Sequence, residues 1–341
     1  MPSESVISSP MRGRFAPSPT GRMHLGNVYT ALMSWLSVKS RGGEWVLRIE
    51  DLDPQRSRLE YARQIEDDLL WLGLEWDEGG VDGRGCCGPY LQSRRHEIYD
   101  ECLRRLKDTS LTYSCGCRRA DILATQAPHQ SDGRVIYGGT CRPERLSHLG
   151  VFASFNDFKH NISAAFHKEM STERENKLQA SVRLYAPDCP IEFTDLVCGK
   201  QVMNLARECG DFIVRRSDGA WAYQLAVVAD DAMMEITEVM RGNDLLLSSA
   251  QQIYIAGLLG FKSPSFAHLP LVCNSEGMRL SKRDRSLSME SLRNMYTPSQ
   301  LLGLIAHLAG LMPSPDSVGL SELISLFRMP STSPSAIIRL K

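Results

Sequence analysis

The stretch that decides the fold reads Arg14-Phe15-Ala16-Pro17-Ser18-Pro19-Thr20-Gly21-Arg22-Met23-His24-Leu25-Gly26-Asn27. Residues 12–16 predict a short strand, because Pro17 cannot continue a hydrogen-bonded ladder. A helix is expected from about His24 to Lys39, where apolar residues recur at every fourth position. A strand, a rigid loop and a helix start in this order indicate the opening unit of a parallel α/β sheet.

The next elements repeat this pattern and extend it to a doubly wound sheet. Residues 45–49 predict a buried strand that ends at the acidic Glu50, and residues 58–72 and 94–107 predict helices. Ligands of doubly wound sheets bind at the carboxyl ends of the strands. The loop Pro17–Gly21 and Glu50 are therefore expected at a ligand site.

Beyond residue 110 the alternation is interrupted, and it returns with residues 211–215, 222–228 and 235–240. A helix over residues 248–259 is expected to be capped by Ser248 or Ser249. Residues 268–273 predict a strand that leads into a basic loop, Arg279–Arg283. The division we expect is a flexible tail (1–10), the first half of a catalytic domain (11–110), an insertion (111–205), the second half with the late basic loop (206–288) and a short helical tail (289–341).

Composition excludes some classes of protein. The chain has 341 residues and a net charge of −1 from 39 basic and 40 acidic residues, so it carries no general positive charge for nucleic acid, although a local basic face is compatible with this. No run of eighteen apolar residues predicts a membrane span, and the first ten residues lack the features of a secretory signal. We therefore expect a cytoplasmic protein whose cysteines are reduced or bound to metal.

Two separate groups of residues suit a nucleotide. His24 and Gly26 stand at a predicted helix start, where free N–H groups and the positive dipole end favour phosphates. His24 can donate to a phosphate oxygen, and Gly26 permits close approach. Lys282 in the late basic loop can stabilise charge that develops in a nucleotidyl transition state. Each group alone is also explained by a helix cap or a solvated basic turn, but together they favour a nucleotide site.

Seven segments together resemble the class I aminoacyl-tRNA synthetases, specifically the glutamyl branch and, most closely, its short glutamyl-Q tRNA(Asp) members. They occur in the family's order from near residue 12 to near residue 310, and they are Phe15–Gly21, Leu47–Pro54, Cys115–Cys117, Asp211–Val214, Ala222–Asp231, Thr237–Gly242 and Leu280–Lys282. The resemblance implies a Rossmann-like doubly wound catalytic domain with a zinc-containing insertion.

The resemblance also implies which residues bind substrate. Two arginines suit the two carboxylates of glutamate because guanidinium groups form forked bonds to carboxylates, although which arginine binds which carboxylate stays open. Glu50 suits the substrate ammonium. The implied glutamate residues are Arg14, Phe15, Ala16, Pro17, Ser18, Glu50, Tyr223 and Arg241. The implied ATP residues are His24, Gly26, Asn27, Ser281 and Lys282, of which His24, Gly26 and Lys282 are expected to be catalytic.

A cysteine group in the predicted insertion suits one structural zinc ion. Cys115, Cys117 and Cys141 supply three thiolates, and tetrahedral zinc needs a fourth ligand. The residues alone leave reduced free thiols as an alternative. The resemblance implies Tyr137 as the fourth ligand, while His129 and Asp132 lie between the cysteine turns and are rivals.

The chain departs from the family at a few positions. Asn27 stands where the nucleotide signature has a second histidine, and Arg279 where many members have lysine. Both retain hydrogen-bonding capacity or charge, so we expect activity to be kept. The segment 147–178 matches nothing in the family, and its role is open.

The function that the resemblance implies is a two-step ligation. The enzyme is expected to activate glutamate with ATP and Mg²⁺ without tRNA, then to transfer glutamate to queuosine in the anticodon loop of tRNA(Asp). Only 59 residues follow Lys282, so we expect no anticodon-binding domain and a monomer. The alternatives are a small glutamyl-tRNA synthetase that charges a tRNA 3′ end, an adenylate-forming ligase with a small acceptor, and a non-catalytic RNA-binding module.

Overall fold

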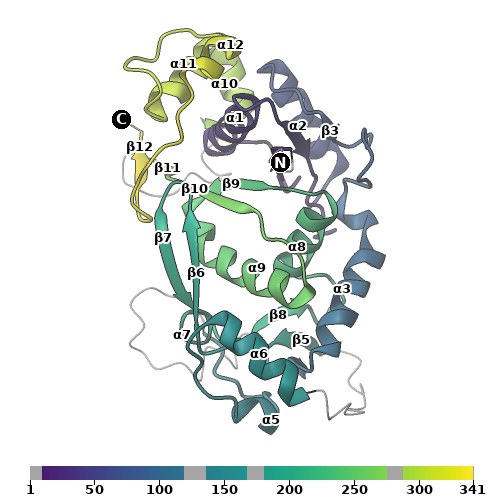
Figure 1. Cartoon of the computed structure of the whole chain (residues 1–341). Coiled ribbons are helices and arrows are strands. Elements are labelled where there is room, and N and C mark those ends of the chain that lie inside the picture. Colours follow the sequence, from purple (N-terminus) through teal and green to yellow (C-terminus); the bar gives the residue numbers. More distant parts are fainter. Residues whose placement is uncertain (1–9, 119–135, 167–179, 275–286, 341) are drawn as a thin grey trace, which may run out of the picture.

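The computed structural model of the chain describes residues 10–118, 136–166, 180–274 and 287–340 (Figure 1). The tail predicted over residues 1–10 lies almost entirely outside these residues. So does part of the segment 147–178.

A five-stranded sheet in the order β10-β9-β1-β2-β3 organises the molecule, and every neighbouring pair in it is parallel. The predicted α/β class is therefore confirmed. The chain order reverses between β1 and β9, and this switch point is where such sheets bind ligands. The strands are β1 (Arg12–Phe15), β2 (Glu44–Leu47), β3 (Glu78–Gly79), β9 (Glu238–Gly242) and β10 (Ser265–Leu269).

Helices cover both faces of this sheet (Figure 1). Side chains of a strand alternate between faces, so Trp45 and Leu47 of β2 pack with one core while Val46 packs with another. The first core contains α1 (Leu25–Lys39) and α2 (Leu59–Trp71). The opposite side holds α3 (His96–Asp108), α8 (Tyr223–Met233) and α9 (Leu246–Leu259), with short 3₁₀ turns η1 (Gln92–Arg94) and η2 (Asn243–Leu245) between elements.

The predicted cap of α9 is wrong. The helix begins at Leu246, and its N-cap residue Leu245 makes no side-chain capping bond. Ser249 is instead fully buried in the helix and bonds to Arg241. The local sequence around a serine near a helix start does not show whether the serine caps the helix or lies buried within its first turns.

The region from residue 112 to residue 215, which includes most of the predicted insertion, contains a small antiparallel sheet and a hairpin. The sheet has the order β4-β5-β8, and the hairpin pairs β6 with β7. The strand at residues 211–215, which the pattern placed with the returning catalytic sheet, is β8 and pairs with β5 instead. The elements are β4 (Thr112–Cys115), α5 (Glu144–Ser147), α6 (Phe155–Phe166), β5 (Ser181–Leu184), β6 (Pro190–Asp195), β7 (Gly199–Asn204), α7 (Leu205–Glu208) and β8 (Phe212–Arg215).

The chain after Ser288 forms three helices that pack on the first core. Leu301 and Ile305 of α11 and Leu323 of α12 are buried there with α1. The predicted strand over residues 268–273 is broken at Pro270 into β10 and β11, and β11 pairs with β12 near the C-terminus. These elements are β11 (Leu271–Cys273), α10 (Met289–Met295), α11 (Pro298–Leu308), α12 (Leu320–Leu326) and β12 (Ile337–Arg339).

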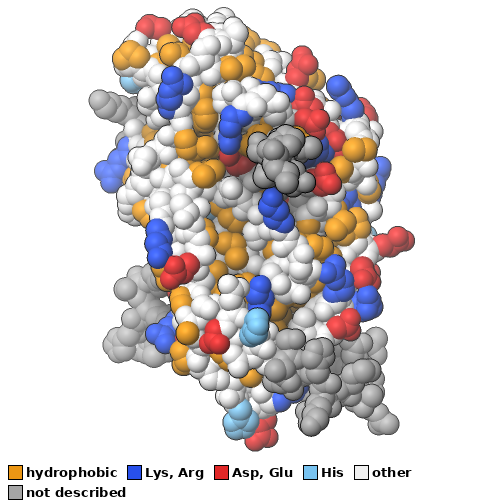
Figure 2. Space-filling view, viewed as in Figure 1, with side chains coloured by type: hydrophobic (Ala, Val, Ile, Leu, Met, Phe, Trp, Pro, Cys, Tyr) orange, Lys and Arg blue, Asp and Glu red, His pale blue; other side chains and the backbone are white. Residues whose placement is uncertain are grey.

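The surface carries both signs of charge. Figure 2 shows Lys and Arg side chains interspersed with Asp and Glu over the described residues of the face drawn, in keeping with the net charge of −1. Among the described helices, none has the length and apolar character that a bilayer crossing requires.

Candidate active site

A cavity of about 490 Å³ opens at the carboxyl ends of β1 and β9, at the switch point of the sheet. Predicted residues from distant parts of the sequence meet in its lining, and Ser281 and Lys282 lie outside the described residues. The predicted residues that line it are Arg14, Phe15, Ala16, Pro17, Ser18, His24, Gly26, Asn27, Glu50, Tyr223 and Arg241.

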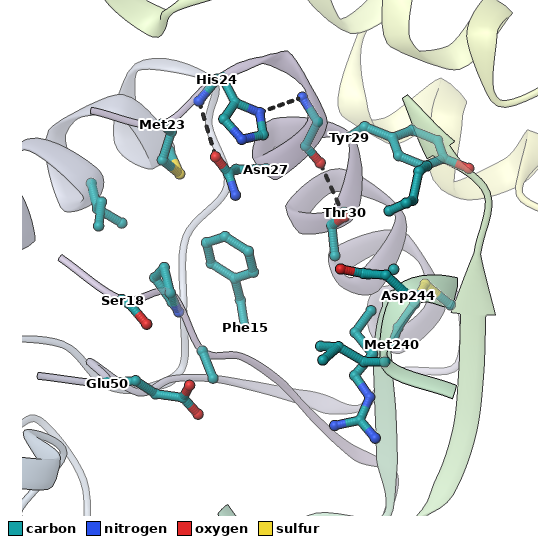
Figure 3. Close-up of a pocket in the computed structure, with 18 of the residues that line it drawn as sticks. Phe15, Ser18, Met23, His24, Asn27, Tyr29, Thr30, Glu50, Met240 and Asp244 are labelled. Atoms are coloured by element: carbon teal, nitrogen blue, oxygen red, sulfur yellow. Dashed lines mark hydrogen bonds between the residues drawn. The ribbon is translucent and has the colours of Figure 1, made fainter. Parts of the chain in front are cut away.

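His24 and Asn27 form one end of the cavity, and Glu50 lies at the other with Phe15 between them (Figure 3). His24 caps α1: its Nδ1 accepts from the Gly26 N–H at 3.1 Å, and its own N–H donates to Asn27 Oδ1 at 3.1 Å. An accepting Nδ1 leaves the proton of the neutral ring on Nε2. The ring is therefore oriented as a hydrogen-bond donor, which suits a phosphate oxygen.

A side chain at position 26 would crowd the histidine. A Cβ on Gly26 would meet the imidazole of His24 at 3.1 and 3.2 Å. The expectation that the helix start offers free N–H groups is wrong for two of them, because the N–H of Gly26 bonds to His24 Nδ1 and that of Asn27 to His24 O. The His24 ring thus replaces the Gly26 N–H as the donor at this end.

The described residues on both sides of the late basic loop adjoin the same end of the cavity. Val272, before the loop, lines the cavity. After the loop, Ser288 forms a bridge with His24, and the Met289 N–H donates to Met23 O at 2.8 Å. The residues that follow the late basic loop are therefore joined to the N-terminal signature segment through the backbone.

Arg241, on β9, is 4% exposed, and its hydrogen-bond partners among the described residues are all neutral. Its Nη2 donates to Ser249 Oγ at 2.6 Å, its Nη1 to Tyr223 Oη at 3.3 Å and its Nε to His268 Nε2 at 3.2 Å. Burial lowers the pKa of Arg241. No carboxylate of the described chain forms an ion pair with this guanidinium, so its charge is available to an anion in the cavity.

Arg14, on β1, is also buried and only weakly paired. Its Nε lies 3.4 Å from Asp231 Oδ1, while its Nη2 has no hydrogen-bond partner among the described residues. Asp231 is bound more closely by Arg48, whose Nη1 donates to it at 2.6 Å. Arg14 therefore adds a second under-compensated positive group to the lining.

Glu50 supplies the negative group of the cavity. It is buried, accepts from Arg48 Nη2 at 3.2 Å, and its backbone N–H bonds to Pro17 O at 3.0 Å, which ties it to the loop after β1. Burial raises the pKa of Glu50, and the nearby Arg48 and Arg14 oppose this rise. Two buried arginines and one buried carboxylate in a single cavity match a small ligand with two anionic groups and one cationic group.

Sequence reasoning missed several groups around the cavity. Asp244 and Met240 line the cavity, and both lie close in sequence to the predicted Arg241 (Figure 3). His268 and Asp195 do not line it. They form a buried pair behind Arg241, and His268 was interpreted only as a strand residue. Nothing local in the sequence indicates this pair, because the two residues lie 73 positions apart.

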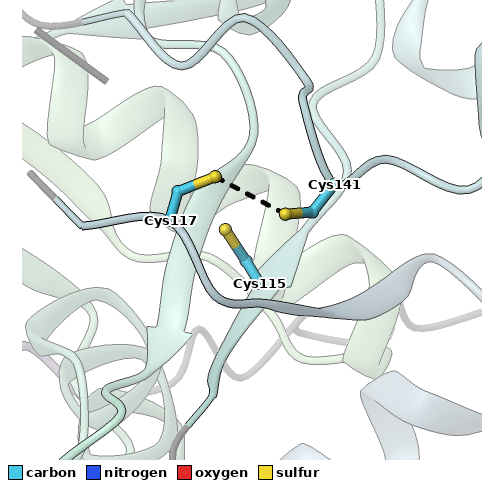
Figure 4. A group of neighbouring side chains, drawn as sticks. All are labelled: Cys115, Cys117 and Cys141. Carbon is cyan, nitrogen blue, oxygen red and sulfur yellow. Dashed lines mark hydrogen bonds between the residues drawn. The ribbon is translucent and has the colours of Figure 1, made fainter. Parts of the chain in front are cut away.

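The cysteine cluster lies in the small antiparallel sheet region. The sulfur atoms of Cys115, Cys117 and Cys141 point toward one another and lie within 4.8 Å, with Cys117 and Cys141 at 3.5 Å (Figure 4). Tyr137 Oη lies 3.5 Å from Cys115 Sγ and 4.0 Å from Cys117 Sγ. Sulfur atoms bound to one zinc at about 2.3 Å would have separations of this size. His129 and Asp132 lie outside the described residues.

The chemistry of this donor set also suits a metal. Burial opposes ionisation of Cys115, but its hydrogen bonds with Tyr137 and Arg183 outweigh this effect and bring its pKa to about 7. Burial and the neighbouring thiols raise the pKa of Cys117 to about 11. A bound cation would stabilise the thiolates together, since metal binding displaces thiol protons.

A second sulfur group was not expected from the sequence. Glu78, Cys86 and Cys87 also bring their ligand atoms within 4.8 Å. The Glu78 carboxylate is already bound by Arg12 Nη2 at 2.7 Å and by the Tyr90 hydroxyl. This prior pairing makes the group a poorer metal site than the cysteine cluster.

Comparison with known proteins identifies the family. A model described as tRNA synthetases class I (E and Q), catalytic domain, matches residues 10–326. The chain belongs to this family, and it is therefore an enzyme of the ligase type.

Relatives place it more narrowly. It is 40% identical to a Glutamyl-Q tRNA(Asp) synthetase of Nitratidesulfovibrio vulgaris, over 97% of this chain and 98% of that one. It is 36% identical to Glutamate–tRNA ligase 2 of Coxiella burnetii, over 96% of this chain and 66% of that one. The crystal structure of a glutamate tRNA ligase from Elizabethkingia meningosepticum, in complex with its amino acid, superposes with a TM-score of 0.76 at 28% identity, over 98% of this chain and 67% of that one.

Proposed function

We propose that the enzyme activates L-glutamate with ATP, without tRNA, and then transfers the glutamyl group to queuosine in the anticodon loop of tRNA(Asp). The observation that carries the first step is the buried Arg241, which has no carboxylate partner in the described chain. With Arg14 and Glu50 it provides two positive groups and one negative group. Glutamate carries the complementary set of two carboxylates and one ammonium.

Activation joins glutamate to AMP. A carboxylate oxygen of glutamate attacks the α-phosphorus of ATP, the bond from this phosphorus to the bridging oxygen breaks, and pyrophosphate leaves. His24 faces the phosphates with Nε2–H, and Lys282 from the late basic loop stabilises the charge that develops. Mg²⁺, which accompanies ATP, neutralises phosphate charge. The buried groups of the cavity also hold the carboxylate and the α-phosphorus in position for the attack.

Transfer breaks the new mixed anhydride. A hydroxyl of the acceptor attacks the glutamyl carbonyl, an ester forms, and AMP leaves with the electron pair of the broken bond. Queuosine is supported as the acceptor by the printed names of the relatives, since this chain spans 98% of a Glutamyl-Q tRNA(Asp) synthetase but 66% of a glutamate–tRNA ligase.

We propose one zinc ion held by Cys115, Cys117, Cys141 and Tyr137. Its role is structural, because four protein ligands leave no open position for a reacting water or substrate. The ion would tie the turn after β4 to the segment that carries Tyr137 and Cys141. It thereby orders the part of the chain that we expect to meet RNA.

A transfer assay tests the acceptor. Radiolabelled glutamate and ATP are incubated with tRNA(Asp) that carries queuosine, with the same tRNA lacking it, and with tRNA(Glu). Label only on the first, lost after periodate cleavage of the queuosine diol, supports the proposal. The similarity to Glutamate–tRNA ligase 2 favours a small glutamyl-tRNA synthetase as the second candidate, and label on the 3′ end of unmodified tRNA(Glu) would establish it. Label on a small molecule would indicate the remaining alternative, an adenylate-forming ligase with a small acceptor.

A further inference from the structure

We propose that Asp195, acting through the neutral imidazole of His268, fixes the orientation of Arg241 while leaving its positive charge to the substrate. Asp195 and His268 are thus positioning residues. The inference rests on the proposed function in one respect, because the anion that Arg241 meets is taken to be a carboxylate of glutamate.

The carboxylate of Asp195 is held in one orientation. It stands at the end of β6, 2% exposed, and its Oδ1 accepts from three backbone N–H groups. These are Val197 at 3.0 Å, Cys198 at 2.8 Å and His268 at 3.1 Å. Oδ2 is thereby aimed at His268 Nδ1, 2.6 Å away. The turn after β6 thus serves as a rigid support for a single charged oxygen.

This contact determines which nitrogen of His268 carries the proton. Oδ2 of an ionised Asp195 can only accept, so Nδ1 is the donor. Nε2 of the neutral ring is then an acceptor, and it receives the Nε–H of Arg241 at 3.2 Å. Burial lowers the pKa of His268, with Arg241 acting in the same direction and the Asp195 bond opposing it. A neutral, correctly oriented ring is therefore the stable form.

The His268 ring orients the Arg241 guanidinium without neutralising its charge. Arg48 in the same fold meets Asp231 at 2.6 Å and Glu50 at 3.2 Å, so its charge is compensated within the protein. Arg241 is instead held by hydrogen bonds to His268, Ser249 and Tyr223, all neutral. A carboxylate in direct contact with Arg241 would compete with the substrate. An imidazole placed between Asp195 and Arg241 transmits a hydrogen bond without this competition.

Asp195→Asn tests the idea with almost no change in volume. Asn Oδ1 stays with the three backbone donors, so the Nδ2 donor takes the place of Oδ2 and faces His268 Nδ1. The ring then carries its proton on Nε2, which opposes the Nε–H of Arg241. We expect the KM for glutamate in ATP–pyrophosphate exchange to rise about 10- to 100-fold, the scale of one hydrogen bond to a charged group. The KM for ATP should stay unchanged.

Two further variants keep the result interpretable. Glu192→Gln makes the same acid-to-amide change at an exposed position of β6, where Glu192 forms an ion pair with Lys200, and should leave both KM values unchanged. His268→Phe keeps a ring but no acceptor, and should raise the glutamate KM even if Asp195→Asn fails to fold. An unchanged glutamate KM in folded Asp195→Asn or His268→Phe would overturn the proposal, as would an equal rise in the ATP KM.

A spectroscopic readout separates this inference from the proposed function. With ¹⁵N-labelled histidine, the His268 ring, assigned by its loss in His268→Phe, should show protonated Nδ1 in the wild type and protonated Nε2 in Asp195→Asn. Wild-type enzyme without glutamate-dependent exchange would overturn the proposed function. In that case, protonated Nδ1 in the wild type would still support the positioning of Arg241 by His268. Protonated Nε2 in the wild type would overturn it.

Discussion

The substrate cavity and the cysteine cluster are assembled in different ways. In the cavity, Arg14 meets Asp231 across 217 positions of sequence, and buried ion pairs and hydrogen bonds hold the groups. In the cluster, Cys117 and Cys141 lie 24 positions apart and meet through sulfur atoms that a cation would join. The fold itself orders the first site, whereas we propose that the order of the second depends on a bound zinc ion. Glutamate activation and RNA presentation should therefore be separable.

The largest effect on activation is expected at Arg241. Arg241→Ala removes the cation and leaves a substrate carboxylate buried without a partner, which commonly costs about 2–5 kcal/mol. The glutamate KM or turnover in exchange should change accordingly, while metal content stays normal. Arg104→Ala, which removes an exposed arginine paired with Glu101, should change nothing. Intact glutamate kinetics in Arg241→Ala would mean that the cavity binds another ligand.

Lys282 should have the next largest effect. It lies outside the described residues, and its proposed role comes from the resemblance. Lys282→Ala should lower glutamate-dependent exchange by about 10²-fold or more, the scale of losing one electrostatic stabiliser. Lys200→Ala, an exposed lysine of β7, serves as the control. Near-normal exchange would remove the late basic loop from the mechanism.

A smaller effect should follow pH. Burial raises the pKa of Glu50, so this carboxylate becomes protonated at a higher pH than an exposed glutamate does. Protonation removes its attraction for the substrate ammonium. If only the ionised form binds, the glutamate KM rises about tenfold by one pH unit below that pKa. The measurement is exchange between pH 8 and pH 5. Glu50→Gln should start with a higher KM and lose this dependence, and a flat wild-type profile contradicts the assignment.

The smallest effect on activation is expected from metal removal, and it is the sharpest test of separability. Chelation, or Cys141→Ser, should leave exchange unchanged but reduce transfer to tRNA and expose residues 111–205 to proteolysis, since structural zinc can supply on the order of 10 kcal/mol of folding free energy. Elemental analysis gives the metal content. Exchange that falls in parallel with zinc would show that the two sites are one unit.

The same contrast explains what the sequence could predict. The predicted glutamate- and ATP-binding residues that the structure describes all line the cavity, because they follow strand ends and lie in recognisable segments. The support behind Arg241 was not predictable, since Asp195 and His268 belong to elements that meet only in the folded chain. The partner of β8 was equally hidden, because alternating burial looks the same in either sheet.

The hydrogen bond from Met289 to Met23 has a bearing on biosynthesis. A ribosome makes the chain in order, so every described side chain around Arg241, up to His268, exists before Met289 is added. The carbonyl of Met23 can accept this hydrogen bond only after synthesis of the first of the C-terminal helices has begun. The side chains around Arg241 are therefore all synthesised before the hydrogen bond between Met289 and Met23 can form.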